Sequence, residues 1–177
     1  MNRKDSDGYI ILTNTQKKLL DRIHQTSFNP DLFGTLTFRE NSFKGVMNTF
    51  DDGLTQKQHS WLDKHLSKFM CRLNQFYYGK RWFKKMRNDK HVAVQIILAI
   101  EIHNGQYHCH FVAQTPDIQY CGQHLFKGII KECWYDLPYC KGSQVKIDPI
   151  WWADGAIAYI SKDFHKNRGL HPNWRLL

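Results

Sequence analysis

One acid and two histidines, Glu101, His108 and His110, are the residues whose types and spacing point most directly to chemistry. They lie in residues 94–115, where two apolar runs rich in β-branched residues flank the dipeptide Asn104-Gly105. Such a dipeptide is typical of a two-residue β-hairpin turn, because both of its residues accept positive φ. The segment therefore predicts a hairpin with the acid on one strand and both histidines on the other.

The predicted turn fixes which residues face each other across the hairpin. Glu101 lies opposite His108, and the small Ala99 lies opposite His110, with opposed β-carbons about 5 Å apart. Because successive side chains alternate between the two faces of a strand, both histidines point to one face and Cys109 to the other. One carboxylate and two imidazoles thus converge on one patch of sheet, as in a metal site.

The donor set limits the chemistry of this predicted site. Three ligands leave coordination positions open, which suits a catalytic rather than a closed structural ion. Mixed nitrogen and oxygen ligands are compatible with Mn²⁺, Mg²⁺, Co²⁺ and Zn²⁺. The competing interpretation is that both histidines are ordinary surface residues and that Glu101 forms only a cross-strand charge pair.

A tyrosine and a lysine follow in the last predicted helix, residues 155–165, for which Asp154 is the expected N-cap. Tyr159 and Lys162 are three positions apart and therefore neighbours on one helix face. A tyrosine hydroxyl ordinarily has a pKa of about 10, so it acts as a nucleophile at neutral pH only beside a cation or a base. Lys162 supplies the cation. A tyrosine and a lysine at this spacing are common on helices, so they indicate a function only together with the expected metal site.

A basic segment, residues 79–90, has the composition of a nucleic-acid contact. It holds six basic residues and one acid, with two aromatic residues between them. Basic side chains neutralise phosphates and aromatic rings stack on unpaired bases, a combination suited to single strands. The alternative is a solvated loop whose aromatic side chains pack into the core. The expected DNA-binding residues are Lys80, Arg81, Trp82, Lys84, Lys85 and Arg87.

The composition sets limits on the class of protein. A chain of 177 residues suffices for one well-buried core, and 42% hydrophobic residues indicate a folded globule. Lys and Arg number 25 against 16 Asp and Glu, and the net charge of +9 favours a polyanionic partner. Five cysteines without a C-x-x-C pair predict reduced thiols in an intracellular protein. No apolar run approaches the length of about 18 residues that a membrane span needs, and no signal-peptide pattern occurs.

The order of the predicted elements defines the fold class. Strands are expected at residues 33–39 and 143–147 and in the hairpin, and helices at residues 55–77 and 121–134 and at the end. The order β-α-β-β-α-β is the ferredoxin-like α+β arrangement, in which helices cover one face of an antiparallel sheet and leave the other available for a site. We expect one domain over residues 31–177.

Residues 1–30 are expected to form an N-terminal helical extension to this domain. An amphipathic segment places three apolar residues on one face, and Asn14 or Thr15 is the expected N-cap. Such a helix packs either on the domain or on a partner. The sequence alone leaves both possibilities open.

Three ordered motifs resemble those of the HUH endonucleases, particularly the rolling-circle replication initiators of single-stranded DNA viruses and plasmids. They are L-T-F at residues 36–38, H-C-H at residues 108–110 with Glu101 upstream, and Y-I-S-K-D at residues 159–163. The resemblance implies that the acid and both histidines bind a divalent ion, Mn²⁺ or Mg²⁺. It implies that Tyr159 attacks DNA and that Lys162 is its accompanying lysine.

The resemblance also implies an activity and partners. The expected enzyme nicks and religates single-stranded DNA at a specific sequence through a 5′-phosphotyrosine, which initiates rolling-circle replication at an origin or origin hairpin. No G-x-x-x-x-G-K-[ST] motif occurs, so either these residues are the catalytic domain of a longer chain or the expected partner is a separate helicase. The expected location is the cytoplasm of a bacterial host, or the nucleus if the source is a eukaryotic virus.

Other functions share parts of this pattern. A single-tyrosine HUH transposase or relaxase would use the same metal site, but Lys162 and the lack of a clustered three-histidine site favour an initiator. A non-catalytic RRM-like nucleic-acid-binding protein would carry His108 and His110 as surface residues. A structural zinc protein is the weakest alternative.

Overall fold

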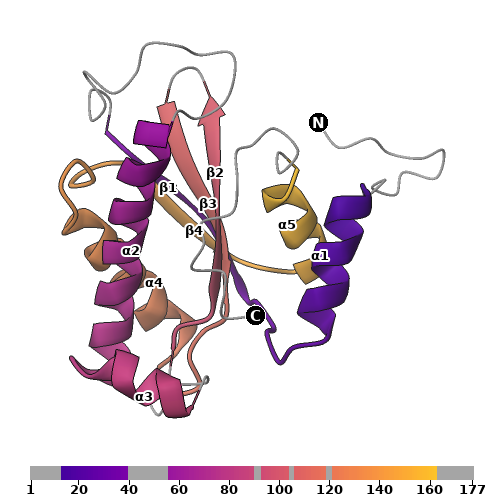
Figure 1. Cartoon of the computed structure of the whole chain (residues 1–177), viewed down its shortest axis with the longest axis horizontal. Coiled ribbons are helices and arrows are strands. Elements are labelled where there is room, and N and C mark those ends of the chain that lie inside the picture. Colours follow the sequence, from indigo (N-terminus) through magenta and orange to yellow (C-terminus); the bar gives the residue numbers. More distant parts are fainter. Residues whose placement is uncertain (1–12, 40–55, 90–92, 104–105, 119–120, 163–177) are drawn as a thin grey trace.

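The structure, a computed structural model, describes residues 13–39, 56–89, 93–103, 106–118 and 121–162. Within these residues, strands form one sheet and helices lie on both sides of it (Figure 1). The strands are β1 (Leu32–Thr37), β2 (Ile96–His103), β3 (Gln106–Ala113) and β4 (Val145–Pro149). The helices are α1 (Asn14–His24), α2 (Gln56–Tyr78), α3 (Trp82–Asn88), α4 (Gln123–Tyr135) and α5 (Ala153–Ile160).

The sheet has the strand order β2-β3-β1-β4, so the hairpin strand β3 lies between β1 and β2. Each neighbouring pair of strands is antiparallel. The β-α-β-β-α-β order and this sheet are compatible with the ferredoxin-like arrangement. The predicted α+β class is therefore confirmed.

The register of the hairpin is the one that the turn predicted. Glu101 lies opposite His108, and Ala99 lies opposite His110. On the other side of β3, Thr37 lies opposite His108 and Thr35 lies opposite His110. The turn residues 104–105 lie outside the described residues. The rows that cross β2, β3 and β1 nevertheless place these six side chains on one face of the sheet.

Helices cover both faces of the sheet, and the expectation that they cover only one is wrong (Figure 1). On the first face, α2 and α4 pack in the larger hydrophobic core, which includes Phe69, Leu73, Ile130 and Trp134. On the second face, α1 and α5 pack in a smaller cluster, which includes Leu20, Ile23, Ile97, Val112, Ile157 and Ile160. The second sheet face carries apolar side chains at one end, and these require a cover.

Two helix boundaries differ from the predicted ones. The N-cap of α1 is Thr13, because the side chains of Thr13 and Gln16 each accept a hydrogen bond from the other's backbone amide. Asp154, the predicted cap of the last helix, lies instead in the first turn of α5. That helix ends at Ile160, before the predicted end, and the hydroxyl of Ser161 donates to backbone carbonyls of its last turn.

The N-terminal helix packs on the domain and contacts α5 directly. The side-chain amide of Gln16 donates a hydrogen bond to the carbonyl oxygen of Ala158 at 2.8 Å. At the other end of α1, Nε2 of His24 lies 2.9 Å from Oδ1 of Asp154. The apolar faces of both helices share the cluster on the second sheet face. α1 therefore helps to fix the position of α5, the helix that carries Tyr159.

All five cysteines are free thiols. Cys109 is buried in the larger core, on the sheet face opposite both histidines, as the alternation of side chains predicted. Across the parts of the chain that the structure describes, no helix combines the length and the apolar character that crossing a membrane requires.

Gly34 in β1 lies where neighbouring strands leave no room for a side chain. A Cβ atom there would overlap the ring of Phe111 and lie 2.8 Å from the carbonyl oxygen of Lys146. We expect Gly34→Ala to lower the free energy of unfolding by about 1–3 kcal/mol, because overpacking displaces side chains and backbone. Urea denaturation measures this loss.

Gly128 in α4 provides the matched control for this substitution. No atom lies within 4 Å of a Cβ atom built at Gly128. The change Gly128→Ala should therefore be neutral, or stabilise the helix by up to about 1 kcal/mol. Equal destabilisation by both substitutions would contradict the steric argument at Gly34.

Candidate active site

The second sheet face changes from apolar to polar along the strands. The row at its apolar end contains Ile97, Val112 and Phe33, and the next rows contain Ala99, His110 and Thr35, then Glu101, His108 and Thr37. We call Thr35, Thr37, Glu101, His108 and His110 the polar patch. Because α1 and α5 pack over the apolar end, the C-terminal end of α5 lies beside this patch.

Threonine hydroxyls on β1 orient both histidine rings of the polar patch. Oγ1 of Thr35 lies 2.9 Å from Nδ1 of His110, and Oγ1 of Thr37 lies 3.3 Å from Nδ1 of His108. The two rings are nearly parallel, with an interplanar angle of 12° and centroids 6.4 Å apart. Because the threonine hydroxyls engage Nδ1, Nε2 of each ring is the nitrogen that can contact another group. Histidines that bind metals are oriented in this way by outer hydrogen bonds.

Glu101 lies between a histidine and a lysine. Its Oε2 is 2.5 Å from Nε2 of His110, and its Oε1 is 2.9 Å from Nζ of Lys162. The side chains are largely buried, with exposed fractions of 21% for Glu101, 11% for His110 and 20% for Lys162. A carboxylate oxygen only accepts hydrogen bonds, so Nε2 of His110 carries the shared proton in this arrangement.

The ion pair between Glu101 and Lys162 shifts the pKa of both groups. Burial alone would raise the pKa of Glu101, but hydrogen bonds from Lys162 and His110 outweigh burial and lower it. Burial would lower the pKa of Lys162, but hydrogen bonds with Glu101 and Tyr159 outweigh burial and raise it. Both groups are charged at neutral pH. Their contribution to stability is lost as pH falls through the lowered pKa of Glu101 or rises through the raised pKa of Lys162.

Tyr159 on α5 contacts the polar patch through its ring. The ring meets that of His110 edge to face, at a centroid distance of 5.5 Å, and that of Phe33 at 5.7 Å. Nζ of Lys162 lies 4.1 Å from the centroid of the Tyr159 ring. The residue is 39% exposed, so the phenol is accessible from solvent. The predicted nucleophile, lysine, acid and one histidine are therefore in direct contact with one another.

The three predicted metal ligands are brought together only in part. Across the described residues, no three His, Cys, Asp or Glu side chains gather closely enough to form a complete metal-binding group. Glu101 contacts His110 of the neighbouring row, whereas His108, which shares the row of Glu101, is held through Nδ1 by Thr37. The donor set nevertheless fits a divalent ion, because a carboxylate and two imidazoles with fixed Nδ1 atoms share one face.

Thr35 offers a test of how the histidines are held. The substitution Thr35→Val keeps the shape of the side chain but removes the hydroxyl bonded to Nδ1 of His110. We expect about a 10- to 100-fold loss of Mn²⁺ affinity, since outer partners of metal-binding histidines have effects of this size. Titration calorimetry with Mn²⁺ measures the loss. Thr26→Val is the control, because the Thr26 hydroxyl donates to the Ile23 carbonyl and does not contact a histidine. Similar affinities in both variants would contradict this role for Thr35.

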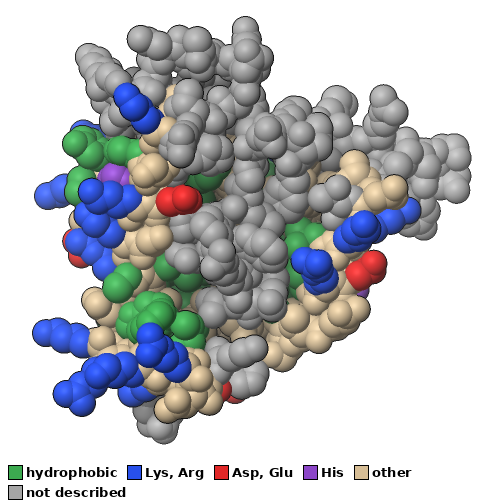
Figure 2. Space-filling model, viewed as in Figure 1, with side chains coloured by type: hydrophobic (Ala, Val, Ile, Leu, Met, Phe, Trp, Pro, Cys, Tyr) green, Lys and Arg blue, Asp and Glu red, His purple; other side chains and the backbone are tan. Residues whose placement is uncertain are grey.

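The predicted DNA-binding residues lie away from the polar patch. Most of them belong to α3 rather than to a loop, and α3 lies at the end of the sheet where β2 begins, whereas Glu101 is near the end of β2 (Figure 1). Phe83 is half exposed and is not packed into the core. Figure 2 shows Lys and Arg side chains gathered at the lower left, over α2 and α3. Binding of DNA by Lys80, Arg81, Trp82, Lys84, Lys85 and Arg87 stays a prediction.

Several residues near the candidate site were not found from the sequence. Thr35 and Thr37 alternate along a strand-forming segment, but only the pairing of β1 with β3 shows what they contact. Lys146 lies opposite Thr35 on β4 and adds a cation to the same row of the sheet. The adjacent pair Trp151 and Trp152, just before α5, was a visible pattern in the sequence. Asp163 of the third motif lies outside the described residues.

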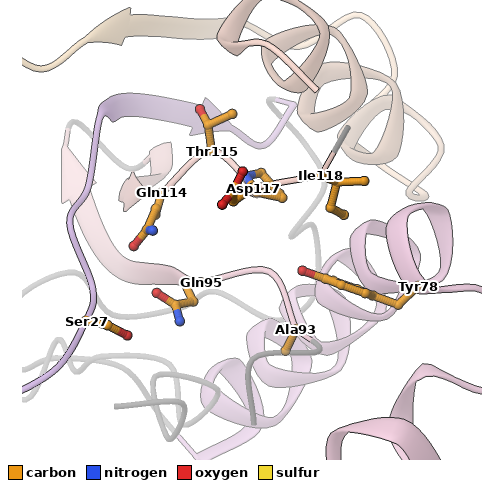
Figure 3. A pocket seen from close by; sticks show the side chains of 9 residues that line it. Ser27, Tyr78, Ala93, Gln95, Gln114, Thr115, Asp117 and Ile118 are labelled. Atoms are coloured by element: carbon orange, nitrogen blue, oxygen red, sulfur yellow. The ribbon is translucent and has the colours of Figure 1, made fainter. Parts of the chain in front are cut away.

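A hollow in the surface lies away from the candidate site. It has a volume of about 360 Å³, and it lies where the strands of the hairpin approach α2 (Figure 3). No residue of the polar patch lines it. The lining residues are Ser27, Tyr78, Ala93, Gln95, Gln114, Thr115, Pro116, Asp117 and Ile118.

Comparisons of the chain with protein-family models, with curated proteins and with solved structures found no match. The geometry around Tyr159 and Glu101 therefore carries the functional argument.

Proposed function

We propose that this protein is a single-tyrosine endonuclease that nicks and rejoins single-stranded DNA and initiates rolling-circle replication. The observation that carries the proposal is the contact of Tyr159 with both His110 and Lys162, while Glu101 bridges the latter two. These four residues come from the β2–β3 hairpin, from α5 and from the turn that follows α5. The resemblance of their motifs to HUH endonucleases supports the same function.

The proposed reaction is an in-line displacement at phosphorus. The phenol of Tyr159 gives up its proton as its oxygen forms a bond to phosphorus, the bond from phosphorus to the 3′ oxygen breaks, and the leaving 3′ oxygen takes up a proton, so protons balance. The product is a 5′-phosphotyrosine and a free 3′-hydroxyl. Because one phosphodiester replaces another, a 3′-hydroxyl can attack the adduct and rejoin the strand.

The residues of the site have separate roles in this reaction. The Lys162 ammonium lies over the Tyr159 ring, where its positive charge is placed to attract the phosphate. Glu101 keeps that ammonium in position, and Thr35 fixes the ring of His110. Glu101, His108 and His110 are the residues that would hold Mn²⁺ or Mg²⁺. When bound, such an ion polarises the scissile phosphate and neutralises its charge.

The proposal is tested with pools of random single-stranded DNA, labelled at either end, incubated with the full chain and Mn²⁺. We expect a covalent protein–DNA adduct that survives denaturation and retains the label of the 3′ end, because the protein is joined to a 5′ phosphate. Sequencing of the trapped strands identifies the preferred site. Binding without an adduct, unchanged by EDTA, would instead indicate a non-catalytic nucleic-acid-binding protein.

The proposed biological context follows from the reaction. In this proposal the initiator acts with a separate helicase, inside the host cell that replicates the DNA. An origin hairpin should then be nicked in its single-stranded loop. A transposase or relaxase would share the adduct but would prefer transposon ends or a transfer origin.

A further inference from the structure

An apolar groove adjoins the candidate active site on the outer side of α5. It has a volume of about 340 Å³ and is open to solvent. Its lining is nearly all apolar and contains four aromatic residues. The lining residues are Phe33, Pro149, Ile150, Trp151, Trp152, Ala156 and Tyr159. A hollow of this size is at the lower end of the range for small-ligand sites, which suits a single planar group.

Two adjacent tryptophans form the exposed wall of the groove. Trp151 is 96% exposed and Trp152 is 60% exposed. Tryptophan side chains bury more apolar area than any other, so a pair left in solvent is a feature of binding surfaces. Trp152 is held in place because its ring packs against Gly155, where a Cβ atom would overlap the ring. Trp151 has no such packing requirement and is available to a ligand.

The groove is continuous with the candidate active site. Tyr159 lines the groove and also contacts His110 and the Lys162 ammonium. Phe33 likewise lines the groove while its ring stacks on His110 at a centroid distance of 6.1 Å. A ligand in the groove is therefore next to the nucleophile. Two cations, Lys162 and Lys146, lie on the polar side of this junction.

We propose that this groove binds one nucleobase of single-stranded DNA, the base next to the phosphate that Tyr159 attacks. The proposal rests on the proposed function, and it adds a subsite that fixes the strand. Aromatic walls stack on a base, and the neighbouring cations hold the backbone phosphates. The occupant is a base rather than a peptide side chain, because Tyr159, which lines the groove, is the proposed nucleophile and acts on a DNA phosphate.

The lining also determines what kind of selectivity the groove gives. It offers almost no polar atoms to read the edge of a base, so recognition depends on stacking area. Purines, with the larger ring system, should bind more tightly than pyrimidines. Loss of the base should weaken binding more than exchange of one base for another. Sequence specificity beyond this must come from other contacts.

The experiment measures non-covalent binding of short fluorescent single-stranded oligonucleotides to the full chain in EDTA, where no cleavage is expected. We expect Trp151→Ala to weaken binding about 5- to 150-fold, the range for loss of one stacked base, and Trp151→Phe to restore most of it. Phe76→Ala is the control, because Phe76 is an exposed aromatic residue, at 60%, but lies on α2. Circular dichroism verifies that each variant is folded.

Photocrosslinking provides a second measurement that requires no substitution. Oligonucleotides with one 5-iodouracil crosslink to the aromatic residue on which that base stacks, and mass spectrometry of the peptides identifies it. Crosslinks at Trp151 or Trp152 support the proposal. Crosslinks at Trp82 or Phe83 overturn it when Trp151→Ala also binds DNA as tightly as Phe76→Ala does. The same result is expected if another segment of this chain fills the groove, and it would overturn the proposal too.

The two proposals fail in different ways. If bases crosslink to the groove but no covalent adduct forms with Mn²⁺, the groove stands and the nuclease proposal fails. If the adduct forms but the groove takes no base, the nuclease proposal stands and the groove proposal fails.

Discussion

Tyr159→Phe is expected to abolish the covalent protein–DNA adduct while leaving the fold and DNA binding unchanged. The substitution removes only the phenol oxygen, so the ring contacts with Phe33 and His110 remain. Without that oxygen no bond to phosphorus can form. Loss of a nucleophile of this kind lowers turnover by at least about a thousandfold. The adduct is measured on denaturing gels after incubation with Mn²⁺ and labelled single-stranded DNA.

Tyr139→Phe is the matched control for this experiment. Tyr139 is also exposed, but its ring lies near Trp61 and His65, on the side of the sheet covered by α2. The Tyr139→Phe variant should form the adduct at the wild-type rate. Persistence of the adduct in Tyr159→Phe would show that the nucleophile is another residue, and the proposed function would then need a different site.

The second large effect is expected at His110. Its Nε2 contacts Glu101 and its Nδ1 contacts Thr35, so His110→Ala removes the central side chain of the polar patch. We expect nicking to fall at least about 100-fold at low Mn²⁺ concentration and to recover partly at high concentration, because a ligand is missing. Nicking rates over a Mn²⁺ series and direct titration of Mn²⁺ binding measure the change independently.

His124→Ala provides the control for His110→Ala, since His124 is exposed on α4 and lies away from the polar patch. Its Mn²⁺ affinity and nicking rate should match those of the wild type. If His110→Ala binds Mn²⁺ with unchanged affinity, or if the wild type nicks equally well in EDTA, the metal site lies elsewhere or is absent from the reaction.

The hairpin and its register were predictable because they depend on local geometry. The turn predicted from Asn104-Gly105 determines which side chains oppose one another, and alternation determines which face they share. The opposition of Glu101 to His108 and of Ala99 to His110 required no knowledge of the rest of the chain. The α+β class was predictable for a similar reason, because the spacing of apolar residues along each segment distinguishes helices from strands.

The full candidate site was not predictable, because it depends on contacts between distant segments. The position of Tyr159 over the polar patch requires α5 to pack on the second sheet face beside α1. The link from Glu101 to Lys162 joins β2 to a turn after α5. Asp154 lies in the first turn of α5 rather than capping it, and its carboxylate pairs with His24, a residue 130 positions earlier. Sequence periodicity carries no information about such pairings.

The hydrogen bond from Gln16 to Ala158 and the pairing of His24 with Asp154 fasten both ends of the nucleophile's helix to a segment that precedes the sheet. The histidines, by contrast, are anchored within the sheet itself. The two halves of the candidate site thus have separate supports. If the proposed function is right, a disturbance of α1 would shift the Tyr159 hydroxyl relative to the phosphate and leave both imidazoles in place, so α1 would affect the reaction without contacting the DNA.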